Sequence, residues 1–268
     1  MSLLHAIVLG IVQGLTEFLP VSSKTHLVLV PFMAGWKQPT LAFIVAVHVG
    51  TLLSVTWVFR DRLLAILRTV VNRNGVERDR RLLVLLVIGT IPAVVIGAVF
   101  ENAIDRSFGK PVLAATLLGV TAWVLFSAES HYERRENHRP DDSMTPADAG
   151  VIGVAQAVAV LPGISRSGTT ISAGMWRGLT REAAMRFSFL LSIPIILGAT
   201  IVKLPDLARE GASGSGGAIV IGVLASAATG VFAIRAMLGA VAKRGLRPFG
   251  VYCVLVMVAG LLTALARG

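Results

Sequence analysis

The sequence has very little of what a disulfide-bonded or soluble protein requires. Cys253 is the single cysteine among 268 residues. An internal disulfide and a cysteine-ligated metal site are therefore excluded. Acidic residues number only 15, against 25 lysines and arginines. Hydrophobic residues make up 54% of the chain, and the mean hydropathy is +0.76. Because a soluble domain cannot bury that much apolar surface, composition predicts an integral membrane protein.

Apolar residues gather into six stretches that lack Asp, Glu, Lys and Arg. Each is close to the length of helix that crosses about 30 Å of hydrocarbon. The stretches are residues 41–59, 82–100, 111–128, 187–202, 216–234 and 248–266. We therefore predict an all-α, multi-pass protein in which residues 1–268 form one membrane domain.

Basic residues are distributed unequally between the segments that join these stretches. When the loops are assigned alternately to two sides, 16 lysines and arginines fall on one side and six on the other. The richer side comprises loops 60–81, 130–147, 176–186 and 242–247. The positive-inside rule makes that side cytoplasmic and places both termini outside. Since topology accounts for the net charge of +10, nucleic acid is not an expected partner.

Two further apolar segments, residues 3–36 and 148–175, are interrupted midway by polar, glycine and proline residues. Backbone without helical hydrogen bonds is tolerated at membrane depth only where protein or a water-filled cavity surrounds it. We predict that both segments are re-entrant helix–turn–helix hairpins. The alternative for residues 3–19 is an ordinary short span.

The two hairpins resemble each other in sequence. GIVQ at 10–13 matches GVAQ at 153–156, and LPVSS at 19–23 matches LPGIS at 161–165. Three predicted spans follow each hairpin, and an odd number of crossings turns the second half upside down. We therefore predict an inverted repeat whose broken helices meet at a central site. The first repeat is 1–129, the cytoplasmic linker loop is 130–147, and the second repeat is 148–268.

Charged residues inside the apolar segments are few. With Asp148 at the end of its segment set aside, Glu17 is the one acid, and Lys24, Arg166 and Arg235 are the bases. A charge at the bilayer centre costs at least about 2.5–3.5 kcal/mol and so needs a partner or a function. Arg235 is near the end of its span and can snorkel. Glu17 and Arg166 could simply neutralise each other, but an ion pair does not explain the hydroxyl residues around them.

The sequence PGISRSGTT at 162–170 has the features of a phosphate site. Glycines let backbone N–H groups face inward, and a helix N-terminus attracts anions. The planar guanidinium of Arg166 matches phosphate oxygens. A carboxylate beside bound phosphate suggests a divalent cation such as Mg²⁺. Gln13 and Glu17 are one helical turn apart, so both can face that ion.

Ser23 and His26 have the types and spacing of a nucleophile and a base. Alternatively, Ser22 or Ser23 caps the helix that begins near His26. We prefer the cap for Ser22 and catalysis for Ser23, given the anion site opposite. His48 lies inside the stretch 41–59. It either supports the site or packs against a neighbouring helix, and the sequence favours neither.

Long motifs carry a family resemblance. QGLTEFLPVSS at 13–23, followed by His26, LPGISRSGTTIS at 161–172 and FSFLLSIP at 187–194, resembles the bacterial undecaprenyl-pyrophosphate phosphatases of the bacitracin-resistance type. The likeness runs nearly end to end. It implies a hydrolase of the bacterial cell membrane, with an extracytoplasmic opening, that removes one phosphate from the C55 polyprenyl diphosphate carrier of cell-wall synthesis. It also implies dependence on a divalent cation, Mg²⁺ or Ca²⁺.

The resemblance also implies roles for individual residues. Glu17 and Gln13 would bind the metal, and Ser23, His26, Glu17 and Arg166 would be catalytic. The substrate phosphates would meet Ser165, Arg166, Ser167, Gly168 and Thr170. Lys24 is added to this predicted set for its charge and not from the family pattern. The expected partners are the polyprenyl diphosphate and membrane lipids, with a homodimer left open.

Two positions depart from the family pattern. Gln13 stands where the family often has Glu. Lys24 and Thr25 replace a small hydroxyl residue and a glycine, which removes a conformationally free residue from the turn. Lys24 either adds a diphosphate contact or obstructs the usual substrate pose.

Other readings stay open. Inverted repeats and broken helices also build secondary transporters, and a lipid-phosphate flippase or anion transporter would need the same arginine and hydroxyls. It would not need Ser23 together with His26. Water activated by His26 or Glu17 could replace Ser23 as the nucleophile. An inactive relative is suggested only by Lys24 and Thr25.

Overall fold

The computed structural model describes residues 1–71, 76–100, 109–210 and 216–267. These residues are helices and their connections, without a β-strand among them. Six of the described helices are long and apolar enough to cross a membrane. They are α3 (Leu41–Val58), α5 (Glu77–Val99), α7 (Pro111–Glu133), α10 (Arg181–Val202), α12 (Gly216–Ala236) and α14 (Arg247–Arg267). All six predicted spans are thus confirmed, and the chain is an all-α, multi-pass membrane protein.

The helices extend beyond the apolar runs that predict them. α5 begins at Glu77 and α10 at Arg181, both before the predicted starts at residues 82 and 187. Helical hydrogen bonding continues past the point where side chains become charged, so a search for uncharged runs stops too early. The prediction of a loop over residues 60–81 was wrong in part, because charged residues there also form helices. This segment contains the helix α4 (Arg60–Val71) and the start of α5.

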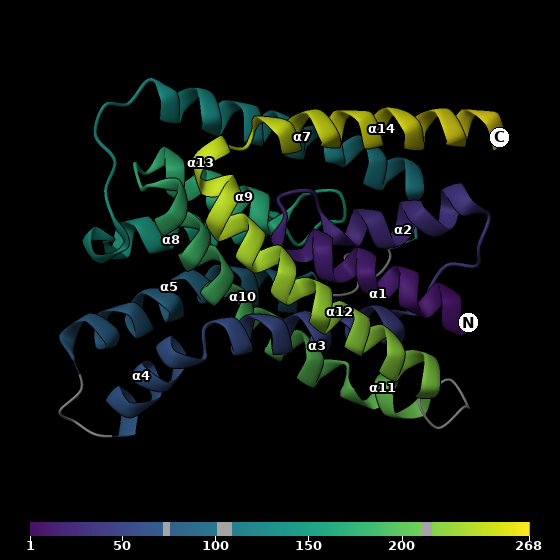
Figure 1. Ribbon diagram of the computed structural model, residues 1–268, viewed down its shortest axis with the longest axis horizontal. Helices are drawn as coiled ribbons and strands as arrows, with labels where there is room; N and C mark the ends of the chain where they lie inside the picture. Colours follow the sequence, from purple (N-terminus) through teal and green to yellow (C-terminus); the bar gives the residue numbers. More distant parts are fainter. Residues whose placement is uncertain (72–75, 101–108, 211–215, 268) are drawn as a thin grey trace.

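Both predicted hairpins have the expected helix–turn–helix form. The first is α1 (Leu3–Phe18) and α2 (Ser23–Ala34), and the second is α8 (Pro146–Val158) and α9 (Arg166–Trp176). Helices of 11 to 16 residues reach only about 17–24 Å, less than the hydrocarbon thickness. The hairpins extend inward from opposite ends of the molecule, and their turns approach each other near its middle (Figure 1). Both chain termini lie at the end from which the first hairpin starts (Figure 1).

Helix packing relates the two halves of the chain. α1 packs along α12, and α8 packs along α5. α3 packs on α10, and α7 lies beside α14 (Figure 1). If the two halves are exchanged, α1 corresponds to α8 and α12 to α5, so the contact of α1 with α12 becomes the contact of α8 with α5. The contacts of α3 with α10 and of α7 with α14 stay the same. These contacts support the inverted repeat, which stays a prediction together with its boundaries.

Glycines at matching positions of the two hairpins allow this packing. A Cβ atom on Gly10 of α1 would lie 2.5 Å from the carbonyl oxygen of Gly222 in α12. A Cβ atom on Gly153 of α8 would lie 2.6 Å from the carbonyl oxygen of Gly89 in α5. Gly10 and Gly153 are the first residues of the matching GIVQ and GVAQ segments. Each hairpin is therefore seated by close backbone approach to a span of the other half.

A pair of substitutions within α8 tests this packing. Gly153→Ala should lower the free energy of unfolding by about 1–3 kcal/mol, because the new methyl group forces two backbones apart. Gly150→Ala is the control, because its Cβ atom would meet nothing within 4 Å. Since alanine favours helix over glycine, the control should be neutral or slightly stabilising. Thermal unfolding of detergent-purified protein measures both, and equal melting temperatures would contradict the packing.

The predicted linker loop, residues 130–147, is anchored to the second hairpin through Arg139. Arg139 donates to the buried carboxylate of Asp148 at 3.0 Å and to the carbonyl oxygen of Arg177 at 2.7 Å. The Arg177 Nε donates to the same carboxylate at 2.7 Å. Burial raises the pKa of Asp148, but hydrogen bonds from the Thr145 N–H and the two arginines outweigh burial and lower the pKa to about 2. Asp148 therefore remains ionised and holds the start of α8 against the linker.

Candidate active site

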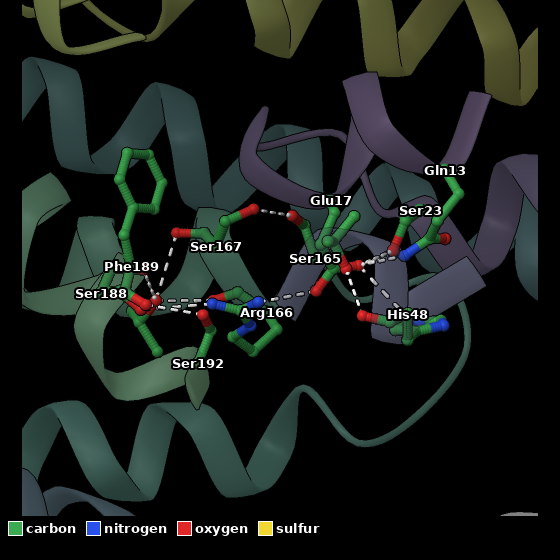
Figure 2. Close-up of polar contacts among 12 residues, drawn as sticks. Gln13, Glu17, Ser23, His48, Ser165, Arg166, Ser167, Ser188, Phe189 and Ser192 are labelled. Atoms are coloured by element: carbon green, nitrogen blue, oxygen red, sulfur yellow. Dashed lines mark hydrogen bonds and ion pairs between the residues drawn. The ribbon is translucent and has the colours of Figure 1, made fainter. Parts of the chain in front are cut away.

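Glu17, on the last turn of α1, is the centre of the site. Its Oε2 accepts hydrogen bonds from Gln13 Nε2 at 2.9 Å and from Ser23 Oγ at 2.5 Å. Its Oε1 accepts from Arg166 Nη2 at 2.6 Å. Figure 2 shows the carboxylate with Gln13 and Ser23 on one side and Arg166 on the other. The structure thus brings four of the predicted residues together, three from the first hairpin and Arg166 from the second.

The turn between α1 and α2 places Ser23 beside Glu17. Ser22, just before α2, has a φ of 67°, the one positive φ at a non-glycine residue in the described ranges. Such a conformation is uncommon because of steric repulsion at Cβ. The Ser22 hydroxyl accepts from Thr25 Oγ1 at 2.9 Å, and it makes no capping hydrogen bond to the backbone. The predicted side-chain cap is therefore not formed, although Ser22 occupies the N-cap position.

His26 does not contact Ser23 in the way that the nucleophile–base prediction requires. Its Nδ1 lies 2.8 Å from the carbonyl oxygen of Ser22, and its Nε2 lies 2.9 Å from the Tyr252 hydroxyl. A carbonyl oxygen only accepts, so Nδ1 carries the hydrogen and Nε2 of the neutral ring accepts from Tyr252. The hydroxyl of Ser23 donates to Glu17 instead. The carboxylate, and not the imidazole, therefore lies next to the Ser23 hydroxyl.

The start of α9 is held in shape by several of the predicted phosphate-binding residues. Ser165 is the N-cap, and its hydroxyl accepts from the Gly168 N–H at 3.0 Å. The Thr170 hydroxyl donates to the carbonyl oxygen of Arg166 at 2.7 Å. Arg166 is thus the first residue of a capped helix. Its guanidinium lies at the helix end that attracts anions.

Two side chains connect the hairpins at their turns. The Ser167 hydroxyl donates to the carbonyl oxygen of Leu19 at 2.9 Å. The Lys24 ammonium donates to the carbonyl oxygen of Val160 at 3.1 Å. The unusual lysine therefore joins the first hairpin to the turn of the second.

Arg166 is fixed by contacts on two other elements. Its side chain is 14% exposed. Besides Glu17, its Nη1 donates to the carbonyl oxygen of Ser188 in α10 at 3.2 Å, and the Ser188 hydroxyl lies 2.6 Å from Thr170 Oγ1. A guanidinium has five N–H donors, more than these contacts use. Arg166 can therefore contact phosphate oxygens while it stays bonded to Glu17.

The residues around Glu17 fit a divalent cation. Gln13 is fully buried, and its Oε1 has no hydrogen-bond partner within the described part of the chain. A carboxylate and an amide oxygen are donors that Mg²⁺ and Ca²⁺ accept. No cluster of three or more His, Cys, Asp and Glu side chains suited to a metal occurs in residues 1–71, 76–100, 109–210 and 216–267. Glu17 with Gln13 thus remains the candidate.

Three residues of the site were not predicted from the sequence or were left undecided. His48 Nε2 lies 3.5 Å from Glu17 Oε2, which places His48 at the site and not merely in a helix contact. Tyr252, one of two tyrosines in the chain, comes from the last span. A tyrosine hydroxyl within an otherwise apolar stretch is unusual, and this could have marked Tyr252 as a candidate site residue. Ser188 lies in the FSFLLSIP motif, but nothing in the sequence pairs it with Arg166.

Comparison with known proteins agrees with the motifs. Residues 6–259 match the family described as bacitracin resistance protein BacA. The chain is 42% identical to the undecaprenyl-diphosphatase of Gemmatimonas aurantiaca over an alignment of 272 positions that covers 100% of both chains. It is 40% identical to that of Thermodesulfovibrio yellowstonii, over 93% of both chains. It is 39% identical to that of Geobacter sulfurreducens, over 100% of both chains. By these matches across its whole length, the chain belongs to the BacA family.

Proposed function

We propose that the chain is an undecaprenyl-diphosphatase, which hydrolyses the C55 lipid diphosphate to the lipid monophosphate and phosphate. This reaction recycles the carrier lipid of cell-wall synthesis and confers bacitracin resistance. The observation that carries the proposal is the Glu17 carboxylate, which contacts the Ser23 hydroxyl and the Arg166 guanidinium at once. The names of the relatives agree with it. Family membership does not favour a flippase or an anion transporter.

The geometry suggests how the residues share the reaction. Arg166 and the N-terminus of α9 bind the diphosphate. Ser23 Oγ attacks the terminal phosphorus and gives its proton to Glu17. The bond from that phosphorus to the bridging oxygen breaks, and Glu17 passes the proton to the departing lipid phosphate. Water then attacks the phosphoserine, Glu17 takes the proton of the water, and the proton returns to Ser23 as phosphate leaves.

The remaining predicted residues support this chemistry. A divalent cation held by Glu17 and Gln13 supplies positive charge that offsets the charge of the phosphate oxygens. His26, held between the Ser22 carbonyl and the Tyr252 hydroxyl, fixes the turn that presents Ser23. Lys24 adds positive charge where the hairpins join.

We place the protein in the bacterial cell membrane, with both termini and the site opening outside. The basis is the excess of basic residues on the other side of the predicted topology. The lipid tail lies between the spans, with the diphosphate between the hairpins. A homodimer stays a separate prediction. The proposed function does not depend on it, because all residues of the proposed site come from one chain.

Phosphate release from undecaprenyl diphosphate by detergent-purified protein tests the function. We expect one phosphate per lipid, full dependence on added Mg²⁺ or Ca²⁺, and loss of release in EDTA. A carrier would show no release in detergent, where no gradient exists. No release with any divalent cation would overturn the proposal.

A further inference from the structure

His48 is held in one orientation beside the carboxylate of Glu17. It lies on α3, outside both hairpins, and its side chain is 16% exposed. Its Nδ1 is 2.7 Å from the carbonyl oxygen of Ile44. Because that oxygen can only accept, Nδ1 carries the hydrogen. In the neutral ring, the lone pair of Nε2 therefore faces Glu17 Oε2 across 3.5 Å. In this neutral form of the ring, two electron-pair donors face each other with no hydrogen between them.

Gln13 provides an independent observation on the same carboxylate. Its Nε2 donates to Glu17 Oε2, while its buried Oε1 has no hydrogen-bond partner within the described part of the chain. A buried polar atom without a partner costs about 1–3 kcal/mol. Rotation of the amide group exchanges its oxygen and nitrogen. Turned that way, Oε1 would face Glu17 Oε2, an arrangement that a cation between them stabilises.

We infer that His48 Nε2 is a third protein ligand, with Glu17 and Gln13, of the divalent cation. The inference rests on the cation of the proposed function. A histidine that ligates a metal usually donates its other ring N–H to a backbone carbonyl or a carboxylate, which fixes its orientation. The Nδ1 hydrogen bond of His48 to Ile44 is of this kind. The cation accounts for both the facing lone pairs and the orphaned amide oxygen.

A nitrogen ligand changes which metals the site prefers. Ca²⁺ and Mg²⁺ take oxygen ligands, whereas imidazole suits later transition metals. Mn²⁺ accepts the carboxylate and amide oxygens and gains from the nitrogen as well. The site therefore binds Mn²⁺ more tightly than Ca²⁺, and His48→Gln, which offers an amide oxygen instead, loses that preference.

Electron spin echo spectroscopy of Mn²⁺ bound to the full-length, detergent-purified protein tests the ligand directly. Wild-type protein should show coupling of Mn²⁺ to an imidazole ¹⁴N nucleus, and labelling the histidines with ¹⁵N should replace that coupling. In His48→Gln the coupling should disappear. The Mn²⁺ affinity should fall by at least about tenfold, since loss of even an outer-shell partner costs 10–100-fold. His5→Gln is the control, because His5 stacks on Trp36 near the N-terminus of α1.

The outcomes separate this inference from the proposed function. Bound Mn²⁺ without nitrogen coupling in the wild type, or coupling that persists in His48→Gln, would overturn the ligand assignment even if metal-dependent phosphate release is intact. If His48→Gln does not fold, the wild-type spectrum still tests the assignment, because the absence of an imidazole coupling there overturns it. Nitrogen coupling without phosphate release would leave the ligand in place and overturn the function instead.

Discussion

Replacing Glu17 by glutamine should lower the rate of phosphate release by about 10³-fold or more, while the protein remains folded. Glutamine has nearly the same shape, but it cannot take the proton of Ser23, and it removes the negative charge next to Arg166. Loss of a general base alone costs about 10²–10⁴-fold. The measurement is kcat for undecaprenyl diphosphate at saturating Mg²⁺. Glu17 lies at 2.5 Å from Ser23 Oγ, so a kcat close to wild type would contradict its role as the proton acceptor.

The chain offers a matched control for this variant. Glu129 is another buried carboxylate, 2% exposed, that accepts hydrogen bonds from Arg181 and from the Leu246 N–H. Breaking a buried ion pair costs several kcal/mol of stability wherever it lies. Glu129→Gln should therefore lower the melting temperature without lowering kcat in the folded fraction. If kcat fell in proportion to the melting temperature in both Glu17→Gln and Glu129→Gln, the role of Glu17 would be structural and not catalytic.

Replacing Arg166 should have the second largest effect. Arg166→Ala should abolish phosphate release, and Arg166→Lys should reduce it by about 10²-fold or more. Lysine keeps the positive charge but lacks the planar fork that binds a carboxylate and phosphate together. It also cannot keep both the bond to Glu17 at 2.6 Å and the bond to the Ser188 carbonyl at 3.2 Å. Because the contact to phosphate exists in the bound substrate, KM should rise as kcat falls.

Arg181→Lys is the corresponding control, because Arg181 pairs with buried Glu129 away from the site. It should alter stability and leave kcat and KM unchanged. Near-normal turnover by Arg166→Ala would remove the phosphate-binding role of this arginine and, with it, the assignment of the anion site.

The parts of this structure that the sequence predicts depend on strong, local signals. The spans follow from long runs without charge. Glu17 and Arg166 were identified because an isolated charge within an apolar segment needs a partner. The buried state of Glu129 and Asp148 was missed. Both lie next to charged loops, and only the fold brings arginines close enough to bury them.

The hydrogen-bond partners of His26 could not be predicted from the sequence, for a physical reason. Spacing along the chain places Ser23 and His26 within one turn of α2, but the hydrogen-bond partner of each is set by the turn before the helix. The left-handed backbone of Ser22 belongs to that turn, in which the Ser22 carbonyl engages His26 Nδ1. The partner on the other side, Tyr252, comes from α14. His48 was undecided for a similar reason, because its neighbour Glu17 lies on another helix.

The packing of α1 on α12 also determines when the site can form during synthesis. Residues 3–18 are made first, but their partner helix spans residues 216–236. The second hairpin meets the opposite situation, because α5, its partner, already exists when α8 is made. The first hairpin is therefore seated last, after nearly the whole chain has been translated. Contacts between such distant segments form slowly. A nascent chain that still lacks α12 thus carries Glu17 and Ser23 without a fixed position for either, and on the proposed function it cannot yet act on the lipid.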